Sequence, residues 1–180
     1  IELPLGSASG GGISSNGGSS SNPSLAVGLD GNPLVAWHDR SGGTWEEIYV
    51  KKFNGTSWEE VGSNSASGGG ISNNALASYS PSMAVAQDGN PIVAWYDRSG
   101  GGWEEIYVKK FNGTSWIDVG TGSSSGGGIS NNALASYHPS ITVDQDGNPI
   151  VAWHDNSGGN SEIYVKKFNG TAWVGLAGSG

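Results

Sequence analysis

Three aspartates and two arginines recur at matching places in this sequence and are its clearest candidates for binding chemistry. Asp39, Asp97 and Asp155 each end an apolar run, and Arg40 and Arg98 follow the first two. Carboxylate and guanidinium groups side by side can bind the hydroxyl groups of a sugar or a loop of a partner. The alternative is that each Asp accepts hydrogen bonds from its own loop while the Arg pairs locally.

Aromatic residues lie near these charges in the sequence. Trp45 and Trp103 precede equivalent strands and are replaced by Asn160 in the third unit, and Tyr79 and Tyr137 come late in two linkers. An exposed aromatic ring can stack on the apolar face of a pyranose, and the alternative is a packed loop anchor. The predicted ligand-binding set is therefore Asp39, Arg40, Trp45, Tyr79, Asp97, Arg98, Trp103, Tyr137 and Asp155.

The sequence contains no arrangement that predicts catalysis, a metal or a cofactor. His38 and His154 exchange with Tyr96 at one position, which argues against a general base or a metal ligand there. Residues 144–148 resemble a calcium loop, but the EF-hand spacing is missing and a hairpin turn explains them. We therefore expect no enzyme activity, no metal and no cofactor.

A repeat of 58 residues positions the candidate residues. The stretch 33–39 returns at 91–97 and at 149–155. A fixed period of this length is typical of repeat architectures. It divides the chain into an outer strand with a Gly-rich linker (1–22), a first blade with its linker (23–80), a second blade with its linker (81–138) and a third blade (139–180).

Each unit predicts four strands, which in the first unit are 24–29, 33–39, 47–53 and 56–61. Asp30-Gly31 and Asn54-Gly55 are hairpin turns between them. The second strand is continuously apolar, so it should be buried on both faces. One such sheet buries too little to be stable alone. The sequence therefore predicts an all-β chain of three four-stranded antiparallel β-propeller blades, with a stacked open array as the lesser alternative.

The linkers and the ends of the chain also carry information. Each linker repeats a Gly-rich segment with a single Ile, at Ile13, Ile71 and Ile129, which we expect to anchor it. Residues 1–5 resemble a spare outer strand, and residues 178–180 resemble the start of another linker. Since known propellers have about four to eight blades, two copies could close a six-bladed ring, or the chain could belong to a longer protein.

Composition excludes several classes of function. The net charge of −8 disfavours nucleic acid as a partner. No apolar run approaches the roughly 20 residues of a membrane-spanning helix. With no cysteine there is no disulfide and no thiolate metal site. Asn54, Asn112 and Asn169 begin Asn-Gly-Thr sequons, but the hairpin turn requires the same Asn-Gly, so glycosylation stays open.

The units resemble the blades of sialidase-like propellers with Asp-box (BNR) repeats and of related, highly repetitive secreted propellers. An Asp box reads Ser/Thr-x-Asp-x-Gly-x-x-Trp/Phe, and here Gly55 to Trp58 keeps its second half, as do Gly113 to Trp116 and Gly170 to Trp173. Lys51 and Phe53 replace its Ser/Thr and Asp. Sialidase activity would need three arginines, a Tyr/Glu pair and an acid Asp. This chain has two arginines, so the resemblance implies the fold and not the reaction.

These observations predict a non-enzymatic, extracellular or cell-surface interaction scaffold whose repeated blades bind glycans or a protein multivalently. The alternative is a structural protein that polymerises with itself into a ring or filament by strand exchange at its ends. A sialidase-like glycoside hydrolase is the third hypothesis. Expected partners are further copies of the chain and glycans, with neither nucleic acid nor insertion into a membrane.

Overall fold

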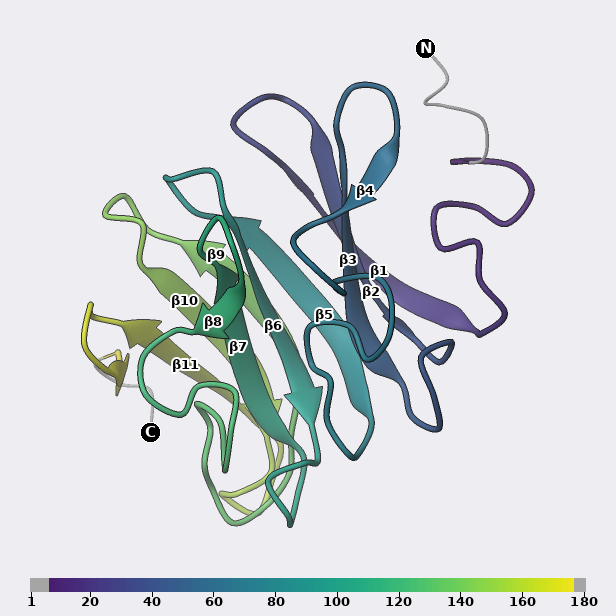
Figure 1. Ribbon diagram of the computed structural model, residues 1–180. Coiled ribbons are helices and arrows are strands. Elements are labelled where there is room, and N and C mark those ends of the chain that lie inside the picture. The colour runs from purple at the N-terminus through teal and green to yellow at the C-terminus, as the bar shows by residue number, and fades with distance from the viewer. Residues whose placement is uncertain (1–6, 177–180) are drawn as a thin grey trace.

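The computed structural model describes residues 7–176, and these form three separate antiparallel sheets of four strands each (Figure 1). The first sheet consists of β1 (Ser20–Val27), β2 (Pro33–Asp39), β3 (Glu47–Phe53) and β4 (Trp58–Glu60). The second sheet consists of β5 (Ser78–Val85), β6 (Pro91–Asp97), β7 (Glu105–Phe111) and β8 (Trp116–Asp118). The third sheet consists of β9 (Ser136–Val143), β10 (Pro149–Asp155), β11 (Glu162–Phe168) and β12 (Trp173–Gly175).

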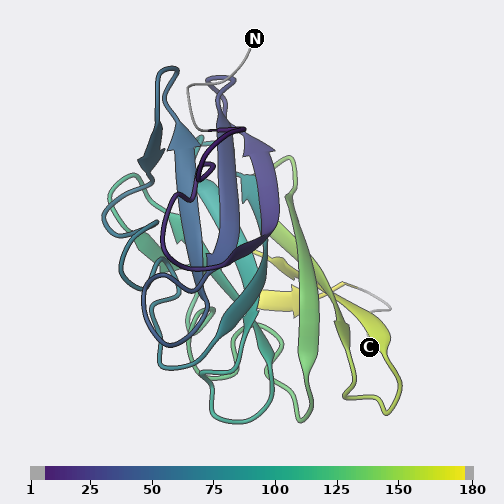
Figure 2. The ribbon, with the colours of Figure 1, turned by 90° about the vertical axis from the view of Figure 1, so that its right-hand side faces the viewer.

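The predicted fold class is confirmed, because each unit of the repeat is one blade with its strands in chain order. We call the sheets blade 1, blade 2 and blade 3. Figure 2, turned by 90°, shows the three sheets fanned beside one another. β1, β5 and β9 are the inner strands, because β5 contacts both of the others. The predicted outer strand 1–5 and the linker start 178–180 lie outside the described residues.

The inner strands begin earlier than the sequence indicates, at Ser20 in blade 1 rather than at Ser24. The register between β1 and β2 shifts between Ser21 and Ser24, which marks a bulge around Asn22 and Pro23. Asn22 adopts a φ of 50°, a left-handed conformation that Asn tolerates. Pro23 has no N–H to contribute to a ladder, so the bulge accommodates it and the strand continues on both sides.

Consecutive blades pack face to face, and the apolar second strand lies at the centre of that packing. Leu34, Ala36, Ile48 and Val50 of blade 1 form one buried cluster with Met83, Val93, Trp95 and Tyr107 of blade 2. Ile92, Ala94, Ile106 and Val108 of blade 2 form the next cluster with Ile141, Val151 and Trp153 of blade 3. The prediction that the second strand of blade 1 is buried on both faces is confirmed, since Leu34, Val35, Ala36 and Trp37 are all at most 8% exposed.

Each linker binds the blade before it and the blade after it. The Ile71 N–H donates to the Ile48 carbonyl of blade 1 (2.8 Å), and the Ile71 carbonyl accepts a hydrogen bond from Lys109 Nζ of blade 2 (2.8 Å). Ile71 is 3% exposed and Ile129 is 4% exposed, so the predicted anchoring role of the linker isoleucines is confirmed for these two. The linker is therefore part of the interface between blades.

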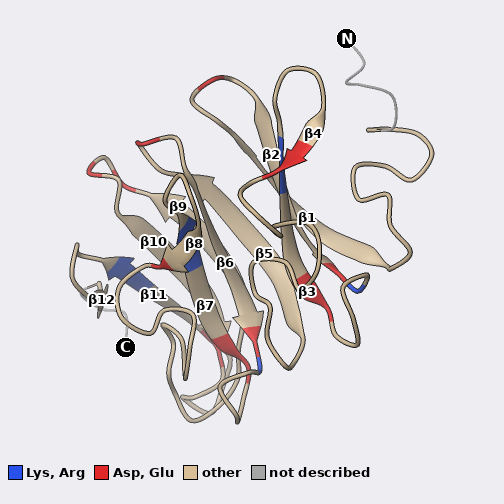
Figure 3. Ribbon diagram, in the orientation of Figure 1, with Lys and Arg blue, Asp and Glu red and all other residues tan. Residues whose placement is uncertain are grey.

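The two adjacent lysines in each third strand have structural roles. The first lysine of each pair donates to a linker carbonyl, as Lys51 does to Ile13 (2.8 Å). The second forms an ion pair with the Asp of the neighbouring hairpin turn, as Lys52 does with Asp30 (2.7 Å). Burial lowers the pKa of Lys109, although Asp118 and other carboxylates oppose the shift. Figure 3 shows the lysines lying on the strands and many acidic residues near strand ends.

Candidate functional site

The three predicted aspartates lie inside the protein rather than on its surface. Asp39, Asp97 and Asp155 are 0%, 1% and 0% exposed. Asp39 Oδ2 accepts hydrogen bonds from Asn16 Nδ2 (2.7 Å), Ser20 Oγ (2.5 Å) and Trp37 Nε1 (2.9 Å), and its Oδ1 accepts one from the Ser41 N–H (2.7 Å). The equivalent Asn, Ser, Trp and loop N–H groups surround the other two carboxylates. Each carboxylate thus joins a linker, two strands and a loop.

Hydrogen bonding lowers the pKa of two of these carboxylates, those of Asp39 and Asp155. Burial by itself raises the pKa of Asp39, but the hydrogen bonds from Ser20, Ser41, Asn16 and Trp37 outweigh it and lower the pKa to about 2. The pKa of Asp155 is lowered in the same way, with burial opposed by Ser136, Ser157 and Trp153. The three carboxylates are buried and accept their hydrogen bonds from groups of the same chain, so they are not part of the surface site described below.

The structure brings predicted residues from two blades together. Tyr79 Oη donates to Glu46 Oε2 (3.1 Å), and Arg40 Nη1 lies 3.9 Å from Glu46 Oε1. In blade 2 the same cluster consists of Arg98, Glu104 and Tyr137. The Glu is the member that sequence reasoning missed. The arginine side chains are more than half exposed, so each cluster presents a guanidinium group at the surface.

The two tyrosines also take part in a row of rings that crosses the blades. The Tyr79 ring lies 5.3 Å from the His38 ring and 5.5 Å from the Tyr96 ring. Tyr137 lies 5.2 Å from Tyr96 and 5.4 Å from His154. These spacings are those of packed aromatic pairs. Burial lowers the pKa of His38, although Glu46 and Asp39 oppose the shift.

Trp45 borders an open pocket between the loop 40–46 and the linker that comes after blade 1. The pocket has a volume of about 400 Å³ and is lined mainly by Trp45, Glu47, Asn73, Asn74 and Ala75, with the glycines of loop and linker. We call it the linker pocket. Trp45 is 43% exposed and Trp103, its counterpart in blade 2, is 49% exposed. A large exposed indole beside amide and carboxyl groups provides both stacking and hydrogen bonding for a ligand.

Glu47 contributes the acidic group of the linker pocket. It is 6% exposed and accepts hydrogen bonds from Ser72 Oγ (2.5 Å) and from the Asn74 N–H (3.4 Å). Burial raises its pKa to about 7, despite the opposing hydrogen bonds. Burial also raises the pKa of Glu105, which has the same contacts with Ser130 and Asn132.

Sequence reasoning missed Glu47 and Glu105, together with the linker amides. Their signal was present, because a Glu opens each third strand and a Ser-Asn-Asn recurs in two linkers. Which residues meet across the pocket depends on the path of the linker, and the repeat alone does not give that path. Trp103, Glu105, Asn131 and Asn132 stand at the equivalent places of blade 2 and its linker.

Close backbone approach holds the loop against the linker at this pocket. A Cβ atom at Gly42 would overlap the Gly68 carbonyl and the Tyr49 hydroxyl, and one at Gly100 would overlap the Gly126 carbonyl. The Tyr49 hydroxyl donates to the Gly68 carbonyl, and Tyr107 makes the same bond to Gly126. Glycine is therefore required at both places for the pocket to keep its shape.

Blade 3 has a different surface at the equivalent place. Asn156, Asn160 and Ser161 replace the Arg, Trp and Glu, and Glu162 is exposed. Within residues 7–176 no cluster of His, Asp and Glu has the arrangement of a metal site. Asp144 of the calcium-like loop pairs with Lys167, as expected for a hairpin turn. No helix among the described residues has the length and apolar character needed to cross a membrane.

No known family model matches the chain, and no curated protein matches it. Solved structures do share its fold. A protein of unknown function from Dyadobacter fermentans has a TM-score of 0.56 at 16% identity, with 88% of this chain and 54% of that one covered. A glycosyl hydrolase from Bacteroides ovatus has a TM-score of 0.54 at 13% identity, with 89% of this chain and 49% of that one covered.

A third similar structure comes from the GH130 family of mannoside phosphorylases, which contains glycoside hydrolases that target β-1,2 mannosidic linkages in Candida mannan. Its TM-score is 0.51 at 14% identity, with 89% of this chain and 49% of that chain covered. The chain thus spans about half the length of these structures. They support the propeller part of the family resemblance, while the Asp box stays a prediction.

These comparisons correct one expectation from the sequence. The absence of an obvious catalytic arrangement led us to expect no enzyme activity, but several structures with this fold are glycoside hydrolases or phosphorylases. The expectation was wrong, because it relied on one known site, the arginine cluster of sialidases.

Proposed function

We propose that the protein binds carbohydrate in the linker pocket of blade 1 and at the equivalent place on blade 2. The observation that carries this proposal is the exposed Trp45 indole in one pocket with the buried Glu47 and the linker amides, and Trp103 is also exposed at the matching position of blade 2. An indole offers an apolar face to a sugar ring, and the Asn and Glu groups suit its hydroxyls. The similar structures support the proposal only through their fold.

Equivalent sites on blades 1 and 2 would act together on a polymeric ligand. When one site holds a chain of sugars, the second meets a high effective concentration of the same ligand, so the overall affinity exceeds that of either site. The exposed side chains of Arg40 and Arg98 lie near Glu46 and Glu104, which directly follow the two Trp residues in the sequence, and offer further donors. We propose a polysaccharide or a glycan-rich surface as the ligand, and hence a place outside the cell or at its surface.

A glycan array followed by calorimetric titration of the strongest ligand tests this proposal. A double variant in which Trp45 and Trp103 are both changed to Asn, the residue that blade 3 has at position 160, should bind at least about tenfold more weakly. A tenfold loss corresponds to about 1.4 kcal/mol. The thermal midpoint should hardly change, because both indoles are exposed. Leu29→Ala is the control, since Leu29 is 72% exposed in a hairpin turn of blade 1. Equal binding by the double variant and the control would refute the proposal.

Hydrolysis of a glycosidic bond is a second candidate function, favoured by Glu47. A carboxyl group that lines a pocket and has a pKa raised to about 7 keeps its proton in about half of the molecules at neutral pH and can act as a general acid. Release of reducing ends from the bound glycan measures this activity. Glu47→Gln combined with Glu105→Gln should remove the release and retain binding. Release that is absent from the unmodified protein, or unchanged in the variant, would contradict the idea.

A further inference from the structure

The outer face of blade 3 has apolar residues at the same places as the buried faces of blades 1 and 2, but in blade 3 they are exposed or only half-buried. Ile48 and Ile106 are each 0% exposed because the following blade covers them, whereas the equivalent Ile163 is 71% exposed. Ile150, Ala152 and Val165 complete this face and are only half-buried, although their counterparts in blade 2 are fully buried. The face is therefore built to be covered, and no described residue covers it.

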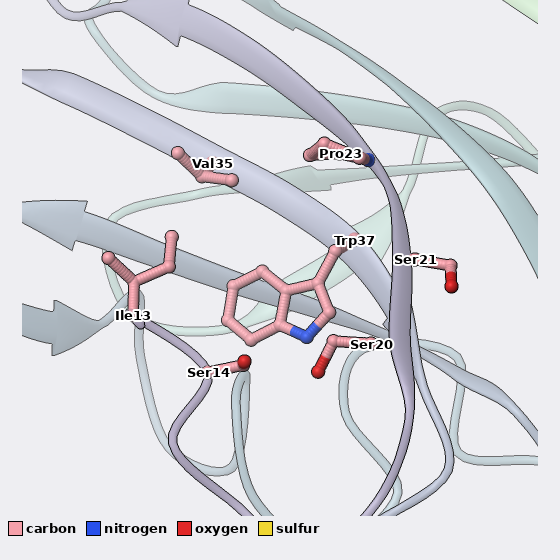
Figure 4. A pocket seen from close by; sticks show the side chains of 7 residues that line it. All are labelled: Ile13, Ser14, Ser20, Ser21, Pro23, Val35 and Trp37. Carbon is pink, nitrogen blue, oxygen red and sulfur yellow. The ribbon is translucent and has the colours of Figure 1, made fainter. Parts of the chain in front are cut away.

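Blade 1 has the complementary surface at the opposite end of the structure. Leu25 is 66% exposed, while its counterparts Met83 and Ile141 are 6% and 9% exposed because a preceding blade packs on them. Beside it is a hollow of about 180 Å³, lined by Ile13, Ser14, Ser20, Ser21, Pro23, Val35 and Trp37. Figure 4 shows the Trp37 indole in this hollow, with the Ile13 and Val35 side chains close by.

The hollow on blade 1 is a place that a blade fills elsewhere in the molecule. In blade 2 the counterparts of Ile13, Val35 and Trp37 are Ile71, Val93 and Trp95. Those three residues lie in one buried cluster with the outer face of blade 1, to which Leu34, Ala36, Ile48 and Val50 contribute. The apolar face of blade 3 has the same chemistry as the face that fills this place in blade 2.

The linkers show the same pattern, because the linker between blades 1 and 2 binds both blades whereas the first linker, within the described residues, binds only the blade after it. Between blades 1 and 2, the Ile71 N–H donates to the Ile48 carbonyl and Ser72 Oγ donates to Glu47. The first linker makes its bonds to blade 1, through Lys51 and Asn16. Its Ile13 and Ser14, which correspond to Ile71 and Ser72, have no preceding blade to bind among the described residues. Glu162 and Ile163 of blade 3 likewise have no described linker beside them.

The tryptophans of β8 and β12 bind the preceding blade. Trp116 Nε1 donates to the Val61 carbonyl (2.8 Å), and Trp173 Nε1 donates to the Val119 carbonyl (2.8 Å). The equivalent Trp58 Nε1 is buried and has no hydrogen-bond acceptor among the described residues. The position that matches Val61 and Val119 is residue 3, which lies outside the described part of the chain.

We propose that the outer face of blade 3 is covered by blade 1 of a second copy of this chain, and that the reciprocal contact closes one ring of two chains. Ile163 would enter the hollow on blade 1, and Glu162 would accept a hydrogen bond from the second copy's Ser14, as Glu47 does from Ser72. A second copy is the occupant because the two faces repeat the two sides of the internal interfaces.

The number of blades favours closure by two copies. Two chains bring six blades, which lies within the range of about four to eight found in known propellers, whereas three chains would bring nine. Each chain then gives one face and one hollow, so the pairing is head to tail and closes after two subunits. This inference is independent of the proposed function, because neither Trp45 nor Trp103 takes part in it.

Light scattering coupled to size-exclusion chromatography tests the proposal on the 180-residue chain over a range of concentrations. The expected mass at high concentration is about twice 18.4 kDa, with a fall to the single-chain value on dilution. The concentration at which half of the chains are paired should rise at least about tenfold in Ile163→Glu and in Leu25→Glu, because each variant places a charge in one of the two contact faces. Both side chains are exposed in the single chain, so both variants should stay folded, which circular dichroism checks.

Mixing the two variants separates head-to-tail pairing from other arrangements. The Ile163→Glu chain keeps an unmodified blade 1, and the Leu25→Glu chain keeps an unmodified blade 3. The mixture should therefore form a two-chain species, held by one unmodified contact, at concentrations where neither variant alone associates. The proposal is overturned if the unmodified chain has the single-chain mass at every concentration, or if its mass continues to grow beyond two chains. It is also overturned if Ile163→Glu leaves the two-chain species intact or if mixing restores nothing.

Discussion

Blades 2 and 3 have nearly the same sequence and very different surroundings. Both contain the strand sequence Glu-Ile-Tyr-Val-Lys-Lys-Phe, yet Ile106 is 0% exposed in blade 2 and Ile163 is 71% exposed in blade 3. Glu105 is buried and accepts hydrogen bonds from Ser130 and from the Asn132 N–H, whereas Glu162 is exposed. The difference between the blades is that a further linker and blade pack against blade 2.

This comparison shows that a blade is not a complete unit of structure in this protein. The residues of a blade supply one side of a core and one side of a pocket, and the next linker and blade supply the other sides. Burial, the pKa of the strand-opening Glu and the shape of the linker pocket are therefore properties of two successive units. Repeat proteins in general divide their stability between units and the interfaces that join them.

The largest loss of stability is expected at the buried Asp, whose hydrogen bonds are the same in blades 2 and 3. Asp97→Asn and Asp155→Asn should each lower the free energy of unfolding by about 3 kcal/mol or more, because an amide cannot accept all the hydrogen bonds and each unpaired buried donor costs about 1–3 kcal/mol. Urea denaturation measures both values. A loss in blade 2 without a loss in blade 3 would mean that these carboxylates also depend on the next blade, contrary to their contacts.

The buried carboxylates of Asp39 and Asp155 predict that the protein is sensitive to acid. The folded-state pKa of Asp39 is about 2 and that of Asp155 is also lowered, so the stability that they contribute is present above their ordinary pKa of 3.8 and is lost as the pH falls toward 2. The thermal midpoint should therefore fall steeply between pH 4 and pH 2. A flat profile over that range would contradict the assigned hydrogen bonds.

Truncation of equivalent isoleucines should affect the stability of the protein differently in blades 2 and 3. Ile106→Ala should lower the free energy of unfolding by about 2–5 kcal/mol, because it leaves a cavity in the core between blades 2 and 3. Ile163→Ala should change it by about 0.5 kcal/mol or less in a dilute solution of single chains, because that side chain is exposed. Equal losses in urea denaturation would show that the outer face of blade 3 is already covered.

A smaller effect should appear in the dependence of stability on pH above 5. The folded-state pKa of Glu47 is raised from 4.5 to about 7, so its contribution is greatest below pH 4.5 and is lost as the pH rises to about 7. Glu47→Gln should therefore flatten the decrease in thermal midpoint between pH 5 and pH 8. Glu162→Gln should have the same dependence of the thermal midpoint on pH as the unmodified protein, because Glu162 is exposed. The assignment fails if both variants behave alike.

Much of the fold could be predicted from the sequence, because the repeat, the Asp-Gly and Asn-Gly turns and the apolar second strand are local signals. The bulge at Asn22 and Pro23 could not, since it depends on pairing between β1 and β2. The site was harder. Trp45 and Trp103 could be predicted from residue type and position, whereas the Asp residues proved to be internal. Glu47 became a candidate only when the path of the linker placed Asn74 beside it.

Hydrogen exchange at two equivalent backbone amides tests most directly whether each blade is completed by the next linker and blade. The Ile106 N–H donates to Ser130 Oγ of the next linker (2.8 Å), so it should be protected at every protein concentration. The Ile163 N–H has no such partner among the described residues, so it should exchange rapidly in dilute solution and slowly where two chains associate. Equal protection of both amides at high dilution would contradict the account, because blade 3 would then be complete without a neighbour.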